Sequence, residues 1–225
     1  LDKKTGNVLW KQKRDEPTSW ASPVVIEHTG VAQAIVPATG RSRGYDVGSG
    51  AVLWAIDGMT QNVIPSAVFG DGLVHLMSGF RGNAMQAIRV ADANGDLAAD
   101  DAQALAWTYD GKNTPYTPSP LLYDGLLYFC RRNDAVLSCF DARSGKPHYE
   151  GRQLDGLRGV YASPLGADGR VYIAGRNGSV AVLEHGPAFK VLATNTLDDS
   201  FDASPVAVGD ALYLRGHKFL YCVAP

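Results

Sequence analysis

Residues 161–184 read YASPLGADGRVYIAGRNGSVAVLE, and this stretch contains most of one structural unit. It opens with the triplet Ala162-Ser163-Pro164, passes a turn at Asp168-Gly169 and continues in an alternating apolar and polar run, which is typical of a half-buried strand. The Asn177-Gly178 pair that follows suits a type I′ turn between antiparallel strands. The stretch therefore predicts three neighbouring strands joined by tight turns.

The same unit recurs along the whole chain. Its opening serines are 44, 53, 44 and 41 residues apart, a period that favours the blades of a β-propeller or another repeat architecture. Each unit is then one small sheet that buries its faces by stacking on its neighbours. The five opening triplets are Ala21-Ser22-Pro23, Pro65-Ser66-Ala67, Pro118-Ser119-Pro120, Ala162-Ser163-Pro164 and Ala203-Ser204-Pro205.

Three further positions keep the period. The second strand carries a tyrosine in three units, and His75 takes that place in another, where we expect a packed, hydrogen-bonded core residue. A polar turn precedes the fourth strand, in which an aspartate accepts backbone N–H groups and a glycine adopts a positive φ, at Asp2 and Gly6, Asp46 and Gly50, and Asp141 and Gly145. The fourth strand is predicted to end in a large aromatic residue that packs between adjacent sheets: Trp10, Trp54, Trp107 or Tyr149.

This pattern resembles the pyrroloquinoline-quinone-like (PQQ-like) β-propeller repeat over essentially the whole chain. Its most specific stretch is Leu1–Trp10, LDKKTGNVLW, and the closing passage also resembles the propeller of the lipoprotein that assists outer-membrane β-barrel assembly. The resemblance implies a single all-β domain over 1–225, built as a β-propeller of four-stranded antiparallel blades. Four blades are complete and two are partial, at about 1–10 (partial), 19–54, 62–107, 115–150, 160–197 and 201–224 (partial).

The ends of the sequence match parts of a blade. Residues 1–10 correspond to the end of a unit, and the unit at 201–224 stops after its third strand. We therefore expect a C-terminal fragment of a parent with seven or eight blades. Two shapes are left open. The favoured one is an open arc, because blade curvature set for a larger ring need not close early; the other is a five-bladed ring in which Asn7–Trp10 completes the last sheet.

Composition agrees with an ordinary globular domain and excludes some partners. Apolar residues make up 45% and charged residues 20% of the 225 residues. A formal net charge of −2 gives no general attraction to nucleic acid, and no apolar run approaches the roughly 20 residues that span a bilayer. The sequence thus predicts no nucleic-acid partner and no transmembrane segment, and the resemblance implies a periplasmic or secreted protein.

The three cysteines do not form a recognisable framework. Cys139 and Cys222 align with the small inward position of the third strand, so both are predicted to be core residues. Cys130 ends a second strand, where its geometry toward Cys139 is poor for a disulfide. The chain has no C-x-x-C motif, which argues against a zinc site.

Two short motifs match functional patterns in an unsuitable context. Residues 40–44, GRSRG, fit the nucleophile elbow of hydrolases, but that elbow needs a strand-to-helix turn and here a β-hairpin is predicted. Asp92, Asn94 and Asp96 are similar to a calcium loop, yet Gln103 stands where the bidentate glutamate is expected. We predict a solvated loop there, inserted into the unit whose spacing is 53 residues.

One face of the predicted propeller is a candidate binding face. Loops entering the first strands and loops joining the second and third strands emerge together, because strand direction alternates. The hairpins carry Arg41, Arg81, Arg131, Arg132, Arg176, His217 and Lys218, and the entering loops carry Trp20, Asn62, Tyr116, Tyr161 and Phe201. Cations beside aromatics suit partner loops or anionic ligands. The alternative is that hairpin tips are polar anyway and the aromatics belong to the core.

Three functions are compatible with the sequence. The first is a non-catalytic scaffold that presents one face to a protein partner, and it is preferred through the resemblance. The second is part of a PQQ-dependent alcohol or sugar dehydrogenase, with quinone and calcium at its axis; no Cys-Cys pair and no catalytic aspartate of that family can be matched here. The third is the ligand-sensing propeller of a bacterial signalling protein. No catalytic, cofactor-binding or metal-binding residue is assigned.

Overall fold

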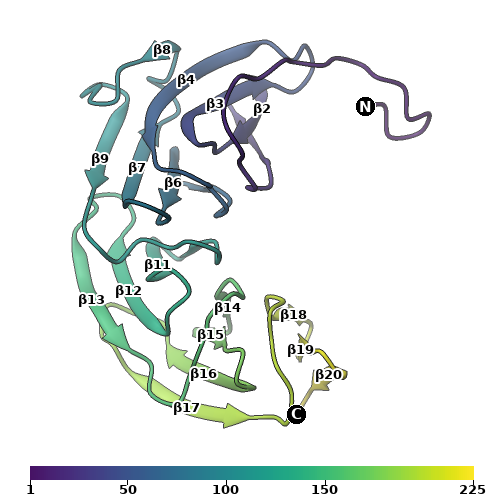
Figure 1. The fold of residues 1–225 in the computed structure, drawn as a ribbon, viewed down its shortest axis with the longest axis vertical. Coiled ribbons are helices and arrows are strands. Elements are labelled where there is room, and N and C mark those ends of the chain that lie inside the picture. Colours follow the sequence, from purple (N-terminus) through teal and green to yellow (C-terminus); the bar gives the residue numbers. More distant parts are fainter.

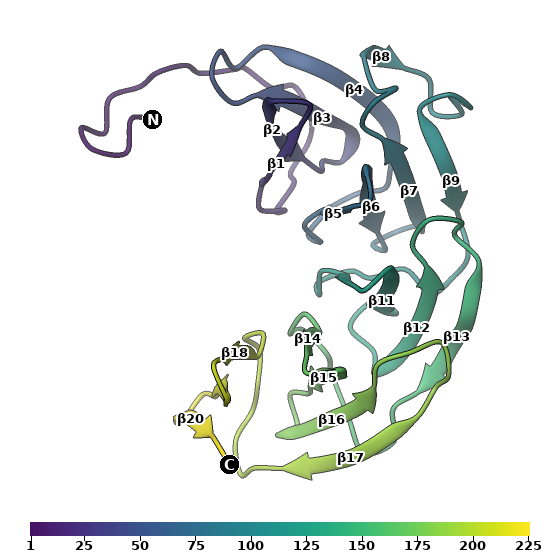
Figure 2. The ribbon, with the colours of Figure 1, turned by 180° about the vertical axis from the view of Figure 1, so that it is seen from behind.

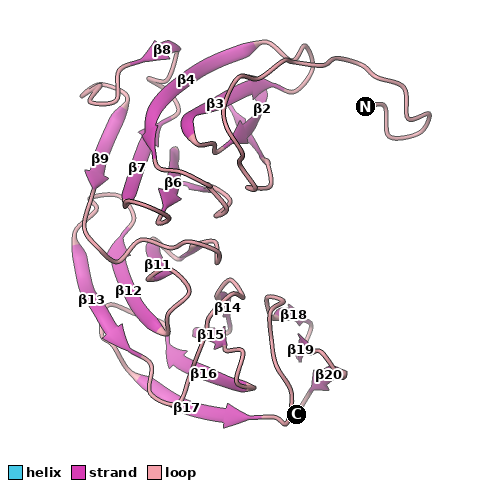
Figure 3. Ribbon diagram, in the orientation of Figure 1, coloured by secondary structure: helices cyan, strands magenta, loops and turns pink.

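The computed structural model describes all 225 residues and contains twenty β-strands and no α-helix. The strands form five sheets that follow one another around an arc, which Figure 1 shows from one side and Figure 2 from behind. The colouring by secondary structure shows strands and loops alone (Figure 3), so no helix is available to cross a membrane. The predicted all-β propeller of four-stranded antiparallel blades is confirmed.

Blades 1 and 2 hold the first nine strands. Every neighbouring pair within a blade is antiparallel except the one that joins β8 to blade 1. Blade 1 has the order β1 (Val24–His28), β2 (Val31–Val36), β3 (Gly40–Asp46), β4 (Val52–Met59) and β8 (Gly95–Leu97). Blade 2 has the order β5 (Val68–Gly70), β6 (Leu73–Ser78), β7 (Ala84–Arg89) and β9 (Leu105–Tyr109).

Blades 3, 4 and 5 follow the same plan, and the last has three strands. Blade 3 has the order β10 (Leu121–Tyr123), β11 (Leu126–Cys130), β12 (Val136–Asp141) and β13 (Pro147–Gln153). Blade 4 consists of β14 (Leu165–Ala167), β15 (Arg170–Ala174), β16 (Ser179–Glu184) and β17 (Val191–Thr196). Blade 5 consists of β18 (Val206–Val208), β19 (Ala211–Arg215) and β20 (Leu220–Val223).

The arc is open. The first strands lie toward its inside and the fourth strands form its outer rim, while blades 1 and 5 stay apart (Figures 1 and 2). Residues 1–20 form no strand, and blade 5 remains a three-stranded sheet. The five-bladed ring, in which Asn7–Trp10 would complete the last sheet, is therefore wrong for this structure.

The fourth strands continue past the aromatic residue at which they were expected to end. Trp54 pairs with Gly44, Trp107 with Ala87 and Tyr149 with Cys139, and the register shifts beside each of these pairs. A bulge bends and twists a strand without ending it. The aromatic therefore sits within its strand, opposite a small residue of the third strand.

The inserted segment is more ordered than a solvated loop. Gly95–Leu97 forms β8, which pairs in parallel with β4 through Trp54 and Gly95, Ala55 and Asp96, and Ile56 and Leu97. The insertion thus adds a fifth strand to the outer rim of blade 1, visible beside β4 in Figure 1. It covers an edge that would otherwise present unpaired backbone groups.

The hydrophobic core lies between blades. A cluster of 14 buried residues joins blades 1 and 2 around Trp54, and one of 13 joins blades 3 and 4 around Tyr128 and Tyr149. Stacking of neighbouring sheets buries their apolar faces, as expected of a repeat protein.

Trp10 and Trp107 also bind the polar turn of the following blade. The Nε1–H of Trp107 donates to the carbonyl of Ala142 at 2.9 Å, and a Cβ atom at Gly145 would lie 2.5 Å from the Trp107 ring. Gly145 has a φ of +70°. Gly145 therefore has two structural roles at this turn: it allows the left-handed backbone, and it makes room for the indole. Trp10 makes the equivalent bond to Val47, at 2.8 Å, over Gly50.

Two expectations about single core positions are wrong. Cys139 is buried, but Cys222 is exposed, because no further sheet covers blade 5. His75 is fully buried, yet neither of its ring nitrogens has a hydrogen-bond partner, so it is packed without the expected hydrogen bond.

Candidate binding face

Two sets of loops meet on one side of the arc. In blade 3 the backbone N–H of Tyr116 donates to the carbonyl of Arg132 at 3.2 Å, and in blade 5 that of His217 donates to Ser200 at 3.2 Å. In blade 1 the hydroxyl of Thr39 donates to the carbonyl of Thr18 at 2.7 Å. We call this side the loop face; it comprises entering loops 18–20, 61–64, 114–117, 159–161 and 198–202 and hairpins 37–40, 79–83, 131–134, 175–178 and 216–218.

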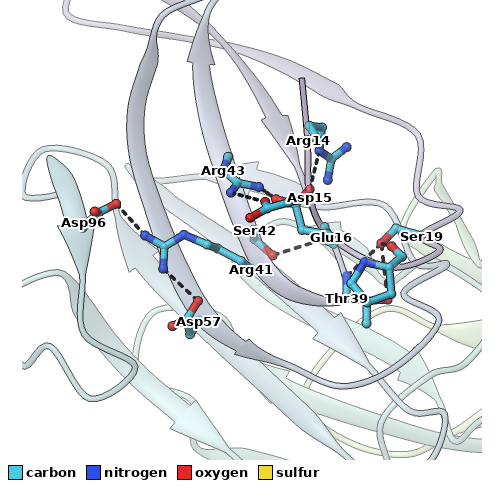
Figure 4. Close-up of polar contacts among 12 residues, drawn as sticks. Arg14, Asp15, Glu16, Ser19, Thr39, Arg41, Ser42, Arg43, Asp57 and Asp96 are labelled. Atoms are coloured by element: carbon cyan, nitrogen blue, oxygen red, sulfur yellow. Dashed lines mark hydrogen bonds and ion pairs between the residues drawn. The ribbon is translucent and has the colours of Figure 1, made fainter. Parts of the chain in front are cut away.

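Arg41 is paired and so gives the loop face no free cation. It is the second residue of β3, and its guanidinium binds Asp57 of β4 at 3.0 Å and Asp96 of β8, as Figure 4 shows. Hydrogen bonds to these carboxylates raise the pKa of Arg41. The side chain therefore fastens the inserted strand to blade 1, and Asp96, part of the segment similar to a calcium loop, is already paired.

A second arginine of β3 holds the segment that precedes blade 1. Arg43 contacts Asp15 at 3.3 Å and also pairs with Glu16, while Arg14 reaches Glu16 at 3.0 Å (Figure 4). Ser42 lies between the two arginines in sequence; it is fully buried and accepts the backbone N–H of Ala38 at 3.2 Å. Residues 40–44 thus form a strand with a structural serine in place of a nucleophile elbow.

Most other cations of the face are also paired. Arg176 binds Asp202 and lies 3.5 Å from the ring centroid of Tyr161. His217 also reaches Asp202, at 3.1 Å, and Lys218 reaches Asp198 at 3.1 Å. These pairs balance the positive charge over blades 4 and 5.

Two predicted aromatic residues differ in their exposure. Phe201 is fully buried and packs edge-on against Tyr221, so it belongs to the core between blades 4 and 5 and does not contribute to the face. Trp20 is 66% exposed, and its backbone N–H donates to Val63 at 2.7 Å, which joins the entering loops of blades 1 and 2. Asn62, in the same loop as Val63, has a φ of +51°.

Sequence reasoning missed Asp199, which organises the hairpin of blade 5. Its carboxylate accepts backbone N–H groups of Ser200 at 2.7 Å and His217 at 2.9 Å, and the Tyr221 hydroxyl at 3.1 Å. Desolvation acts to raise its pKa, but these hydrogen bonds and those from Lys218 and Phe219 lower it to about 2. In the sequence, Asp199 is only an aspartate that precedes Phe201. An aspartate that organises a hairpin cannot be distinguished there from one in a solvated turn.

A pocket of about 460 Å³ lies where blades 2 and 3 adjoin. Phe80 and Tyr116 stack with ring centroids 4.8 Å apart, and the Arg81 guanidinium lies 5.4 Å from the Phe80 centroid. Arg81 and Arg132 are exposed and form no ion pair, whereas Arg131 is paired with Asp134 at 3.0 Å. The lining residues are Gly79, Phe80, Arg81, Tyr116, Arg132, Asn133 and Asp134.

The structure groups no three His, Cys, Asp or Glu residues so as to hold a metal ion. The chemistry of the loop face is suited to binding a ligand. The face offers exposed aromatic surface and guanidinium groups that carry hydrogen-bond donors. The Arg81 and Arg132 pocket is one concavity of this face.

Comparison with known proteins identifies the family to which this fold is similar. The family model for the outer membrane protein assembly factor BamB matches residues 1–149. The solved BamB from Moraxella catarrhalis is 16% identical, with a TM-score of 0.57 over 88% of this chain and 57% of that one. No curated protein matches the sequence.

Two computationally designed proteins share the architecture at lower identity. Ika8 is 13% identical, with a TM-score of 0.64 over 89% of this chain and 57% of its own. Ika4 is 12% identical, with a TM-score of 0.59 over 78% of this chain and 98% of its own. The chain spans 57% of the length of the Moraxella protein. With the family model covering well over half of its residues, the chain belongs to the family of the outer membrane protein assembly factor BamB, whose members are PQQ-like propellers.

Proposed function

We propose that this protein is a non-catalytic scaffold that binds a protein partner through the loop face during outer-membrane protein assembly. The observation that carries the proposal is its membership of the BamB family, shown over residues 1–149. The description of that family names an assembly factor, which acts by binding other proteins. The same membership supports a periplasmic location, which is part of the proposal.

The architecture suits this role. Every blade sends its entering loop and its second-to-third hairpin to the same side, so five blades supply a broad, continuous surface. Aromatic and arginine side chains, which this face carries at Trp20, Tyr116 and Arg132, are the types that contribute most to protein interfaces. The opposite side includes the tight Asp71-Gly72, Asp124-Gly125 and Asp168-Gly169 turns and the Asp-x-x-Ser-Gly turns at residues 46–50 and 141–145.

Site-specific photo-crosslinking in the native host tests the proposal. A photo-reactive phenylalanine analogue at Trp20, which is exposed on the loop face, should capture a protein component of the outer-membrane β-barrel assembly machinery. The matched control carries the same analogue at Ser144, an exposed turn residue of blade 3 on the opposite side. Capture from Trp20 alone supports the proposal, and capture of no envelope protein or equal capture from both positions contradicts it.

A further inference from the structure

We propose that the pocket between blades 2 and 3 receives an acidic, extended segment of the partner protein. This inference rests on the proposed function and adds the chemistry of the ligand and the residues that bind it. We call the site the arginine–aromatic pocket after Phe80, Arg81, Tyr116 and Arg132. Its lining is completed by Gly79, Asn133 and Asp134, the last of which is paired with Arg131.

The cations near the loop face differ in whether a carboxylate of the chain pairs with them. Arg41, Arg131, Arg176 and Lys218 each have a carboxylate partner within the chain. Arg81 and Arg132 have none, although both are exposed and line one pocket. A guanidinium presents its donors in a planar fork that matches a carboxylate, so the complement to this pair is a segment carrying carboxylates.

Both arginines of the pocket have an unusual backbone conformation. Arg81 has a φ of +50° and Arg132 a φ of +47°, in the left-handed region. A residue with a Cβ atom adopts that region at a steric cost, and glycine or asparagine would suit a turn better. Neighbouring blades both place arginine there, which indicates that the side chain has a use beyond closing the hairpin.

The pocket is formed before any ligand arrives. The backbone N–H of Arg132 donates to the carbonyl of Thr114 at 2.8 Å, and that of Thr117 donates to the side-chain oxygen of Asn133 at 3.1 Å. Gly79 permits the close approach of blade 2, because a Cβ atom there would lie 2.6 Å from the carbonyl oxygens of Thr114 and Pro115. A ligand therefore pays little to order these loops.

The aromatic pair selects a peptide over a small anion. Phe80 comes from blade 2 and Tyr116 from blade 3, and their half-buried, stacked rings give apolar surface beside the two arginines. About 460 Å³ is more room than one carboxylate needs. In an extended peptide alternate side chains lie on the same side. A short segment with an acidic residue at every second position would thus present carboxylates to both arginines and keep its backbone and apolar groups against the rings.

A defined peptide tests the inference on the full-length protein. The probe is a fluorescein-labelled eight-residue peptide in which glutamate alternates with tyrosine or glycine, followed by fluorescence anisotropy. We expect saturable binding, and at least tenfold weaker binding of the same peptide with glutamine in place of glutamate. Arg81→Gln and Arg132→Gln should each weaken the glutamate peptide about tenfold, which corresponds to about 1.4 kcal/mol.

Arg143→Gln is the matched control. Arg143 belongs to blade 3, is exposed, forms no ion pair and lies in the turn on the opposite side. Binding unchanged by Arg143→Gln supports the pocket. Equal losses from Arg143→Gln and Arg132→Gln, equal binding of both peptides, or displacement of the peptide by an equal concentration of inorganic phosphate would overturn the inference. If crosslinking at Trp20 succeeds while the peptide fails, the scaffold function stands and the acidic-segment inference falls.

Discussion

The backbone N–H of Ser119 donates a hydrogen bond of 2.9 Å to the hydroxyl of Ser163 in the next blade. The same bond links Ser66 to Ser119 and Ser163 to Ser204, again at 2.9 Å. The serine that marks the repeat in the sequence is therefore a link between blades, and its hydroxyl satisfies a backbone donor near the inside of the arc. This role explains why a serine keeps the period more strictly than the residues around it.

Replacing one of these serines should weaken the stack of blades. Ser119→Ala removes the acceptor of the Ser66 N–H, and leaving a partly buried donor unpaired costs about 1 to 2 kcal/mol of the free energy of unfolding. Ser22→Ala is the control, because Ser22 is exposed and its hydroxyl makes no hydrogen bond, so a change under about 0.5 kcal/mol is expected. Urea unfolding followed by circular dichroism compares the two. Equal stability of both variants would show that the serine links contribute nothing.

Trp54 should be far more important for stability than Trp20. Trp54 is fully buried in the cluster that joins blades 1 and 2, and truncating such a residue to alanine costs about 3 to 5 kcal/mol. Trp20→Ala removes a side chain that is 66% exposed and should cost under about 0.5 kcal/mol. Thermal unfolding of the two variants, which carry the same substitution, provides the comparison. Similar melting temperatures would contradict the assignment of Trp54 as the contact between the sheets.

The sequence was sufficient to predict the blades because their strand pairing is local. Each hairpin joins neighbouring strands, and alternation within a run shows which side is buried. The parallel pairing of β8 with β4 could not be predicted, since the insertion has no counterpart in other units and its partner lies some forty positions earlier. The exposure of Cys222 was equally hidden, because it depends on whether another sheet covers blade 5.

The candidate face, too, could be predicted only in part from the sequence. Chain direction predicted that entering loops and hairpins meet, and the backbone bonds of blades 1, 3 and 5 show how they do. Which cations would be neutralised depended on contacts across long separations, such as Arg41 with Asp96 and Arg176 with Asp202. That Arg81 and Arg132 have no carboxylate partner could likewise be learned only from the three-dimensional structure.

Arg41 should control the order of the inserted strand more than the stability of the protein. Its exposed contacts to Asp57 and Asp96 are worth about 1 kcal/mol or less each, so Arg41→Gln should change the melting temperature little. Loss of the link to Asp96 should nevertheless speed amide hydrogen exchange in Gly95–Leu97 several-fold. Arg131→Gln, which breaks a pair within one hairpin, is the control and should leave that exchange unchanged. Unaltered exchange in Arg41→Gln would mean that backbone pairing alone holds β8.

One cysteine should react in the folded protein. Cys222 is exposed, whereas burial raises the pKa of Cys130 and that of Cys139 to about 12, which keeps both thiols protonated and out of reach. A disulfide reagent should therefore titrate one thiol at pH 8 in native conditions and three in denaturant. Cys222→Ser should abolish the native reaction. Reaction of more than one thiol in the folded protein would contradict the packing of blade 3.

His75 should make stability depend on pH in the mildly acidic range. Burial lowers its pKa from 6.5 to about 4, and its ring lies 5.5 Å from Trp107 with no hydrogen-bond partner. The unfolded chain then binds a proton where the folded protein does not, so stability is full above about pH 6.5 and falls as pH drops toward 4. Between pH 7.5 and 5.0 this difference amounts to about 2 kcal/mol.

The variant His75→Tyr isolates that contribution, because tyrosine occupies the same strand position at Tyr128 and Tyr172. Urea unfolding at both pH values should show the wild type losing about 2 kcal/mol and His75→Tyr losing little of it. His148→Gln, which alters an exposed histidine of blade 3, should retain the wild-type loss. A wild-type loss that persists in His75→Tyr would show that the buried imidazole is not its source, and that protonation elsewhere weakens the stack of blades.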